Sequence, residues 1–273
     1  MGCDYDPWID LENTVRAQHE MQVDLFFPRH HQFMLDNGID KRQKIVDLGT
    51  GDGAFLKKLA GFHPKIQFTG VECRSNLIDK ARLDPAPNIQ WVHADAFHET
   101  TQSLLRGADA AIMRYFILHL PNTKAALPVL LGGVRLGTRL WIFDIDIDKM
   151  RCKPSAPAFK DIKKLVQTFC NKNAVRIRTE RELPAILEAA GFKIDDVSTM
   201  PFNNRTIDPK LFARYVLWEA ILYQYHITGE VFSPMLREAG NFLNNVMTRE
   251  KYFAQYDVTM ISATKTAFNV NGQ

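Results

Sequence analysis

The sequence has few cysteines, no long hydrophobic run and little net charge, and each shortage excludes a class of protein. Its four cysteines lie far apart in 273 residues, with no C-x-x-C pair and no histidines at zinc spacing. They argue against a disulfide scaffold or a zinc module and favour free thiols in a reducing cytoplasm. No apolar run reaches the roughly 18 residues of a membrane span. The net charge of +3 is too small to indicate nucleic-acid binding by itself.

The residues that are present give an ordinary globular composition, with 46% hydrophobic and 24% charged side chains. The first residues are acidic and lack the basic start and apolar stretch of a signal peptide. From residue 44 to 147, strands are predicted at 44–48, 66–72, 89–95, 108–115 and 139–145, with helices at 54–61, 75–81 and 127–136. Strands that alternate with helices pair in parallel, which predicts a doubly wound α/β sheet.

Three further segments add helices to this sheet. Residues 10–27 are predicted to form an amphipathic helix that ends at Pro28. Residues 149–178 form a basic stretch in which apolar and lysine side chains fall on different faces of a helix. The third segment contains a helix at 211–225 that is apolar on nearly every side, followed by a helix at 235–247.

A helix at 182–190, a strand at 192–199 and a final strand at 256–262 complete the predicted pattern. The fifty or so residues between the last two strands far exceed a hairpin loop, so we expect them to form a separate insertion. The sequence therefore predicts three parts: an N-terminal helical cap over 1–40, a catalytic domain over 41–200 and 252–267, and a helical insertion or lid over 201–251.

Residues 47–53, with the sequence DLGTGDG, form a glycine-rich turn between a predicted strand and a predicted helix. Glycines allow a tight turn and let a nucleoside approach the backbone. Glu72 ends the next strand, about 20 residues later, where a carboxylate accepts hydrogen bonds from ribose hydroxyls. Ala54 stands where a dinucleotide motif has its last glycine, which disfavours an oxidoreductase. The third strand ends in Ala-Asp-Ala at 94–96, and together these features favour a nucleoside site over a merely tight turn.

The stretches IVDLGTGDG, GVEC, HADAF and IMRYFILHLPN within residues 44–147 resemble the class I S-adenosylmethionine-dependent methyltransferases, and the later stretch ELPAILEAAGF is also typical of them. The resemblance implies a Rossmann-like methyltransferase fold, in which a mostly parallel seven-stranded sheet has an antiparallel last strand and an added helical cap. It implies S-adenosyl-L-methionine as the cofactor. The implied contacts are Asp47, Gly49, Thr50, Gly51 and Gly53 for the methionine part, Glu72 for the ribose, and Cys73, Asp95 and Ala96 for the adenine.

The charged groups of this cofactor suggest further contacts. Its amino group would find partners in the carboxylate of Asp47 and the backbone of Gly49. Its carboxylate needs a cation, and Arg114 at the end of the fourth strand is favoured over Arg29, which is interpreted as a surface residue. The neighbouring histidines at 30 and 31 are interpreted as a solvated pair, in preference to residues that close over the cofactor.

Methyl transfer from a sulfonium depends mainly on positioning and desolvation, and it needs a base only where the nucleophile arrives protonated. Residues 114–122 follow the fourth strand, where acceptors usually sit in the family. His119 is the first candidate base and Tyr115 a candidate contact to the acceptor. A structural role is the favoured alternative for His119, and a core position is an equal alternative for Tyr115.

Asp144, Asp146 and Asp148 share one face of the fifth strand and its continuation, a pattern compatible with Mg²⁺. Catechol-type methyltransferases add an acidic residue and an asparagine after that strand. The following residues, 149–151, lack this pair. No metal is therefore predicted.

The leading prediction is a methyltransferase that acts on O, N or activated C of a small organic molecule in secondary metabolism. Aromatic-rich helical additions suit a closed apolar pocket, and Trp218 and Tyr223 are the candidate substrate contacts. The alternatives are an RNA methyltransferase that uses the basic stretch 149–178, for which a solvated helix face is the favoured interpretation, and a non-catalytic regulatory protein that binds the cofactor. Neither a nucleic acid nor a membrane is expected as a partner, and a homodimer is left open.

Overall fold

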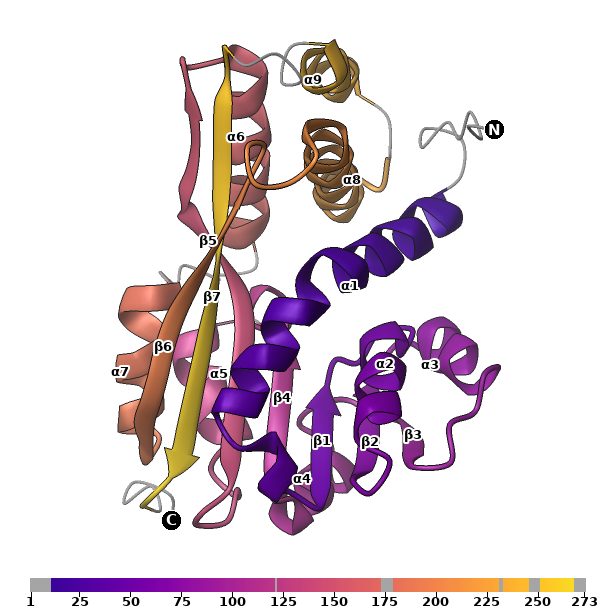
Figure 1. The fold of residues 1–273 in the computed structure, drawn as a ribbon, viewed down its shortest axis with the longest axis vertical. Helices are drawn as coiled ribbons and strands as arrows, with labels where there is room; N and C mark the ends of the chain where they lie inside the picture. Colours follow the sequence, from indigo (N-terminus) through magenta and orange to yellow (C-terminus); the bar gives the residue numbers. More distant parts are fainter. Residues whose placement is uncertain (1–10, 121, 173–178, 231–232, 246–250, 268–273) are drawn as a thin grey trace. The chain divides into compact units, whose positions relative to one another are not determined.

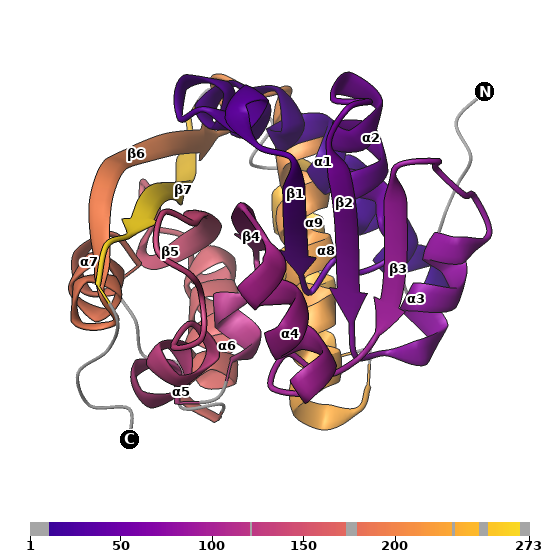
Figure 2. The ribbon, with the colours of Figure 1, turned by 90° about the horizontal axis from the view of Figure 1, so that it is seen from below.

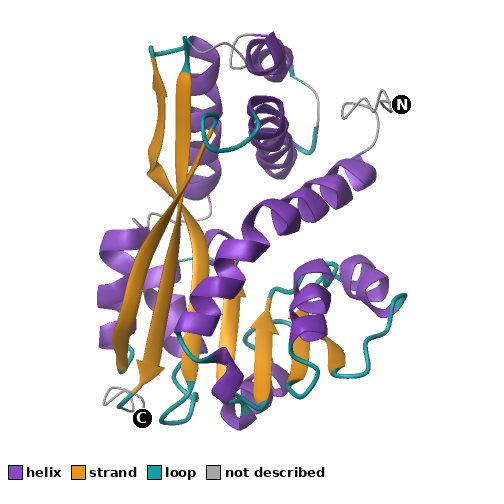
Figure 3. Ribbon diagram, in the orientation of Figure 1, coloured by secondary structure: helices purple, strands orange, loops and turns teal. Residues whose placement is uncertain are grey.

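The computed structural model describes residues 11–120, 122–172, 179–230, 233–245 and 251–267. In these residues seven strands form one sheet in the order β3-β2-β1-β4-β5-β7-β6 (Figure 1). Helices and strands alternate along much of the chain (Figure 3). The chain divides into two compact units: unit 1 holds 1–25, 146–172 and 201–257, and unit 2 holds 26–145, 173–200 and 258–273.

Unit 2 is built on five parallel strands: β1 (Lys44–Leu48), β2 (Gln67–Glu72), β3 (Ile89–His93), β4 (Ala110–Arg114) and the first part of β5 (Arg139–Lys153). Figure 2 shows β1, β2 and β3 in succession. Asp47 of β1 pairs in register with Gly70 of β2 and with Ile112 of β4. The carboxyl ends of these strands consequently reach the same edge of the sheet, where parallel sheets bind their ligands.

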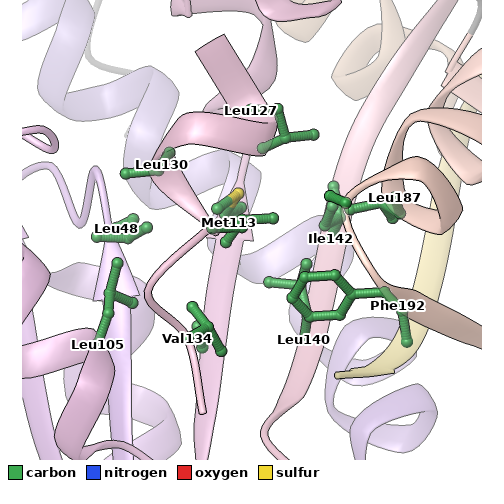
Figure 4. Packing of buried hydrophobic residues seen from close by; sticks show 14 of the residues in the cluster. Leu48, Leu105, Met113, Leu127, Leu130, Val134, Leu140, Ile142, Leu187 and Phe192 are labelled. Carbon is green, nitrogen blue, oxygen red and sulfur yellow. The ribbon is translucent and has the colours of Figure 1, made fainter. Parts of the chain in front are cut away.

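Helices cover both faces of this sheet. The helices of unit 2 beyond α1 are α2 (Ala54–Phe62), α3 (Ser75–Arg82), α4 (Glu99–Gly107), α5 (Thr123–Leu130) and α7 (Thr179–Ala189). Figure 4 shows Leu105 of α4, Leu127 of α5 and Leu187 of α7 in one apolar cluster with Met113 and Ile142 of the sheet. All five side chains are at most 1% exposed, and each burial stabilises the fold by roughly 1.5–3 kcal/mol.

The opposite face is covered by α2 and by the later part of helix α1 (Leu11–Asp36). Phe33 of α1 lies edge-on to Phe143 of β5, with ring centroids 5.9 Å apart. Phe27 of α1 packs in the same way on Phe55 of α2 at 5.6 Å. These contacts fix residues 26–36 beside the carboxyl edge of the sheet.

The predicted antiparallel last strand is confirmed. β7 (Phe253–Lys265) lies between β5 and β6 (Phe192–Asn203), and Figure 1 shows its arrow opposed to those of β1 and β4. The backbone N–H of Lys265, at the end of β7, donates to the carbonyl of Thr138, just before β5, at 3.0 Å. The end of one strand thus pairs with the start of the other.

Lys265 also links β7 to the ends of two helices. Its side chain is 1% exposed, and its ammonium donates to the carbonyl of Ala190 at 2.6 Å and of Leu131 at 3.5 Å. Those carbonyls follow α7 and α5, where a helix leaves its last acceptors without intrahelical donors. Burial lowers the pKa of Lys265 from its ordinary value. The side chain therefore satisfies helix ends from the interior of unit 2.

Unit 1 contains α6 (Pro157–Lys172), α8 (Pro209–Thr228) and α9 (Pro234–Asn245), which pack on one another. The side chain of Asp208 caps α8 by accepting from the N–H of Leu211 at 2.9 Å, and Gly229 ends it with a φ of 78°. Within the described residues, no helix is both long enough and apolar enough to cross a membrane.

The structure corrects several predicted element bounds. Helix α1 runs through Pro28 and does not stop there, because buried Phe26, Phe27 and Phe33 hold the turns on either side. Helix α5 ends at Leu130, six residues before the predicted end at 136, because glycines follow at 132 and 133. The sequence pattern does not indicate helix α4, since its Thr- and Gln-rich sequence carries only two apolar side chains before Gly107.

Candidate functional site

The glycine turn after β1 depends on left-handed backbone conformations. Gly49, Gly51 and Gly53 have φ values of 70°, 63° and 78°, which residues with a side chain rarely adopt. A Cβ on Gly49 would lie 2.6 Å from the ring of Phe116. A Cβ on Gly53 would lie 2.5 Å from the ring of Trp91. Gly49 and Gly53 are thus required by the chain's own packing as well as by the turn.

The turn is fixed to the neighbouring strand by its backbone. The N–H groups of Gly49 and Thr50 both donate to the carbonyl of Val71 in β2, at 2.9 and 3.0 Å. The side chain of Glu72, the next residue, accepts from the N–H of Gly51 at 3.0 Å. The turn and the acidic strand end therefore form one hydrogen-bonded unit.

Glu72 is held as a carboxylate at the end of β2. It is 3% exposed, and it accepts from the backbone N–H and the Nε of Arg74 at 3.0 and 3.1 Å. Burial by itself would raise the pKa of Glu72, but Arg74 and the N–H of Gly51 outweigh it, so the pKa lies below the ordinary value. The thiol of Cys73 donates to the same carboxylate at 3.6 Å. A carboxylate oxygen is therefore available for hydroxyl donors at neutral pH.

Asp47 lies at the end of β1 and is 3% exposed. Burial raises the pKa of Asp47 to about 6, against the opposing charge of Arg114. A cationic group beside this carboxyl would restore its charge, since an opposite charge favours the ionised form. Asp47 is therefore suited to an ammonium group.

Arg114 ends β4 at the same edge of the sheet. Its guanidinium lies 4.6 Å from the ring centroid of Phe55 and 5.2 Å from that of Tyr115. Tyr115 has a φ of 52°, the left-handed conformation that a tyrosine seldom adopts. Such backbone strain is concentrated at functional sites, which keeps Tyr115 a candidate for contact with the acceptor.

His30 lies beside Tyr115 and Arg114, and the prediction that it belongs to a solvated pair is wrong. Its imidazole is fully buried and stacks on Phe143 with centroids 4.3 Å apart; neither ring nitrogen has a hydrogen-bond partner in the described residues. Burial, and secondarily the charge of Arg114, lowers the pKa of His30 well below its usual value. His31 is also packed, and its Nε2 lies 2.9 Å from that of His63. Arg29 is exposed, as predicted.

The segment after β4 positions the candidate base. His119 lies in a short 3-10 helix, η2 (Ile117–His119), and is exposed. Asp144 is fully buried and accepts from the N–H groups of Ile117 and Ile145 at 2.9 and 2.8 Å. This aspartate thus fixes the backbone of η2. Among the described residues, no three His, Cys, Asp or Glu side chains gather as a metal site would require.

Asp95 and Ala96 follow β3 at the same edge. Asp95 is exposed and accepts from the N–H of Phe97 at 2.8 Å, while its carbonyl accepts from Thr101 of α4 at 2.7 Å. The carbonyl of Ala96 accepts from Gln102 at 3.1 Å. These bonds join the loop to α4 and leave the carboxylate of Asp95 at the surface.

The two candidate substrate contacts lie on α8 in unit 1. Trp218 is 6% exposed and has the guanidinium of Arg214 5.8 Å from its ring centroid. Tyr223 is 8% exposed, and its ring lies 5.0 Å from that of Phe169 in α6. Both side chains thus contribute to the interior of unit 1, and their role toward a substrate stays a prediction.

A family described as a methyltransferase domain matches residues 17–197. The chain belongs to this family. The match covers the whole glycine turn, Glu72 and Arg114, and the family's cofactor is S-adenosyl-L-methionine.

Solved structures support the same fold. A candidate methyltransferase from Bacillus halodurans C-125 is 15% identical over 87% of this chain and 99% of that chain, with a TM-score of 0.54. A candidate sarcosine dimethylglycine methyltransferase from Galdieria sulphuraria is 13% identical over 92% of this chain and 85% of that chain, also with a TM-score of 0.54. At these identities the similarity shows the fold alone, and the predicted methyltransferase fold is confirmed.

Among curated proteins, a tRNA (guanine-N(7)-)-methyltransferase from Enterococcus faecalis is 32% identical over 54 residues. The aligned part is 18% of this chain and 25% of that protein. The chain therefore matches about a quarter of this relative's length.

The described residues of unit 2 fit S-adenosylmethionine. The buried carboxyl of Asp47 suits the cofactor's ammonium group, and the guanidinium of Arg114 suits its carboxylate. The ionised Glu72 suits two ribose hydroxyls. Asp47 and Arg114 stand at neighbouring strand ends and influence each other electrostatically. A zwitterionic amino-acid group would pair with both at once.

Proposed function

We propose that this methyltransferase modifies O, N or activated C of a small organic molecule, and that residues 201–251 select that molecule. The burial of α8 carries the proposal. Phe212, Trp218 and Ile221 are at most 6% exposed, so the helix is enclosed by protein on more than one side. A pocket that opened onto such side chains would exclude water and would suit a small apolar acceptor better than an extended polymer.

S-adenosylmethionine, when bound, supplies a methyl group on a sulfonium, which is already an activated leaving group. The chain's own residues then bind and orient the cofactor and the acceptor. Asp47 and Arg114 hold the amino-acid end by charge, and Glu72 accepts from the ribose. Tyr115 lies at the same edge as Arg114, where it can touch an acceptor. His119 stays our candidate for a base, used only where the nucleophile arrives protonated.

An RNA acceptor is the alternative suggested by the basic stretch and by the name of the curated relative. Two lysines of that stretch make hydrogen bonds to backbone carbonyls within unit 1. Lys163 donates to the carbonyl of Met150 at 2.9 Å, and Lys172 donates to that of Ile227 at 3.1 Å. The exposed lysines of α6 face away from its buried apolar side chains, as on any solvated helix. We therefore favour the small acceptor.

Labelled S-adenosylmethionine tests the proposal directly. The protein is incubated with a small-molecule extract and, separately, with total tRNA, and the transferred label is counted. We expect label in a small organic product and none in RNA. Label in RNA alone, with binding that weakens steeply as salt rises, would establish the alternative. Binding of the cofactor without transfer to either pool would identify a non-catalytic protein.

A further inference from the structure

A carboxylate and two phenols meet inside unit 1 on two of its elements. Glu219 of α8 accepts a hydrogen bond from the hydroxyl of Tyr256 in β7 at 2.8 Å. Its other oxygen accepts from the hydroxyl of Tyr215, one turn earlier on α8. The amide of Gln22, from α1, donates to the oxygen of Tyr215 at 3.2 Å. We call Glu219, Tyr215 and Tyr256 the carboxylate–phenol cluster.

Aromatic rings surround the cluster. The ring of Phe202 lies 5.3 Å from that of Tyr215 and 5.5 Å from that of Tyr256, and Phe212 packs on Phe202 at 5.0 Å. Tyr215 and Tyr256 are at most 1% exposed, whereas Glu219 keeps part of its surface accessible. Glu219 is therefore the member of the cluster with surface that a ligand could approach.

The described residues place no cation beside Glu219. Burial raises the pKa of Glu219 to about 7, and only the hydrogen bonds from Tyr215 and Tyr256 act against it. The charged groups nearby are engaged elsewhere, since Arg214 of α8 lies over Trp218 and Asp257 of β7 accepts from Gln255. Helix α1 contributes the neutral Gln22, and no charge from α6 or α9 acts on Glu219.

A purely structural role does not account for a carboxylate without a cation at position 219. A carboxyl without a counter-ion costs stability in its ionised form, and a glutamine would hydrogen-bond both hydroxyls, by accepting from one and donating to the other, without that cost. A bound cation with N–H donors would recover the cost. Each carboxylate oxygen has a further lone pair for such a donor, and the aromatic rings add a favourable surface for positive charge.

We propose that the carboxylate–phenol cluster binds a protonated amino group carried by the methyl acceptor. The proposal rests on the proposed function and narrows it to acceptors that are amines. Glu219 supplies the charge, and the two phenols orient its oxygens. The aromatic walls take the hydrocarbon part next to the nitrogen. Binding needs no proton transfer, because the amine enters as the ammonium ion.

Two probes that differ only in charge test the proposal. Phenethylamine carries an ammonium group at pH 8, and 2-phenylethanol carries a neutral hydroxyl on the same body. Calorimetry on the full chain with S-adenosylhomocysteine present should show tighter binding of the amine than of the alcohol. Glu219→Gln should weaken the amine by about 10-fold and leave the alcohol unchanged, because only the charge is removed.

Two further variants complete the experiment. Glu238→Gln removes an exposed charge from α9 and should change neither affinity. Tyr256→Phe keeps the ring and removes one hydroxyl, so it should weaken the amine less than Glu219→Gln does. Since Glu219 is ionised above about 7, the amine should bind more tightly as the pH rises through that value, and this dependence should vanish in Glu219→Gln.

Several outcomes would overturn the proposal. They are equal or undetectable binding of amine and alcohol, or the same amine affinity in Glu219→Gln and Glu238→Gln. If Glu219→Gln does not fold, an unchanged amine affinity in Tyr256→Phe overturns it as well. These results leave the proposed function standing wherever labelled methyl groups still enter a small uncharged molecule. Transfer to RNA alone removes the proposed function itself, whatever the amine does.

Discussion

At the residue scale, Glu72 tests how the glycine turn holds its cofactor. Glu72→Ala removes the carboxylate that suits the ribose hydroxyls and also the acceptor of the Gly51 N–H. We expect S-adenosylhomocysteine binding, measured by calorimetry, to weaken by about 1–3 kcal/mol. Glu99→Ala, at an exposed position on α4, is the control and should bind normally. Equal affinity in the two variants would show that Glu72 does not contact the cofactor.

His30 makes a prediction about pH. Its folded-state pKa lies well below 6.5, so at pH 5.5 the unfolded chain takes up a proton that the folded chain does not. Stability is therefore complete above about 6.5 and falls as the pH drops, by at most about 1.4 kcal/mol per pH unit. Denaturant unfolding at pH 7.5 and 5.5 should show a smaller loss for His30→Leu than for the wild type.

The matched control for His30 is the exposed His93. His93→Leu should keep the wild-type loss of stability between the two pH values. If His30→Leu loses as much stability on acidification as His93→Leu, the neutral buried imidazole does not contribute to the acid sensitivity.

The site residues that the sequence predicts and the buried residues that it misses differ in how far along the chain their contacts lie. Asp47, Glu72 and Arg114 are predictable because each stands at the end of a strand, a position that a local pattern reveals. The burial of His30 is missed because Phe143, more than a hundred residues later, covers the imidazole. Glu219 is missed for the same reason, since Tyr256 comes from another strand. Sequence periodicity locates neither kind of long-range burial.

At the scale of single elements, α8 carries the prediction about the acceptor. Trp218→Phe and Tyr223→Phe alter side chains inside unit 1 with small changes in volume. With the acceptor found in the labelled extract, both should raise its KM, while the Kd of S-adenosylhomocysteine stays nearly unchanged, because the glycine turn belongs to unit 2. Tyr225→Ala, at a position 39% exposed on the same helix, is the control.

A dimer interface on α8 makes a different prediction. The same two substitutions would then produce monomers in light scattering and leave the acceptor's KM intact. Loss of folding in both variants would identify α8 as core and contradict a role in substrate selection.

Lys265 makes an element-scale prediction about stability. Lys265→Met keeps an unbranched apolar chain but removes the ammonium that satisfies the carbonyls of Ala190 and Leu131. The carbonyl of Leu131 keeps the N–H of Val134 as a donor, but the buried carbonyl of Ala190 loses its donor. That loss costs about 1–3 kcal/mol, which denaturant unfolding would detect. The exposed Lys193 of β6 provides a control, Lys193→Met, which should be nearly neutral. Equal stability of the two variants would show that the helix ends do not depend on Lys265.

The predicted strands agree best with the structure from β1 to β4, although the helix α4 between β3 and β4 is missed. Their ends were less accurate where strands continue with polar residues. The last three strands, β5, β6 and β7, each pass from one compact unit into the other and are longer than predicted. Residues such as Asp146 and Asp257 are buried in them, which no local hydrophobic pattern indicates.

For the whole molecule, the strand order has a consequence during synthesis on the ribosome. β6 emerges well before β7, yet β7 must enter between β6 and β5. At about 5–20 residues per second, the roughly 60 residues from the end of β6 to the end of β7 take about 3–12 s to appear. During that interval β5 and β6 each lack the strand that will pair with them, so their backbone N–H and C=O groups stay exposed. Exposed strand edges of this kind pair readily with other chains. Nascent chains halted before residue 253 should therefore aggregate or recruit chaperones, whereas those released after residue 267 should not.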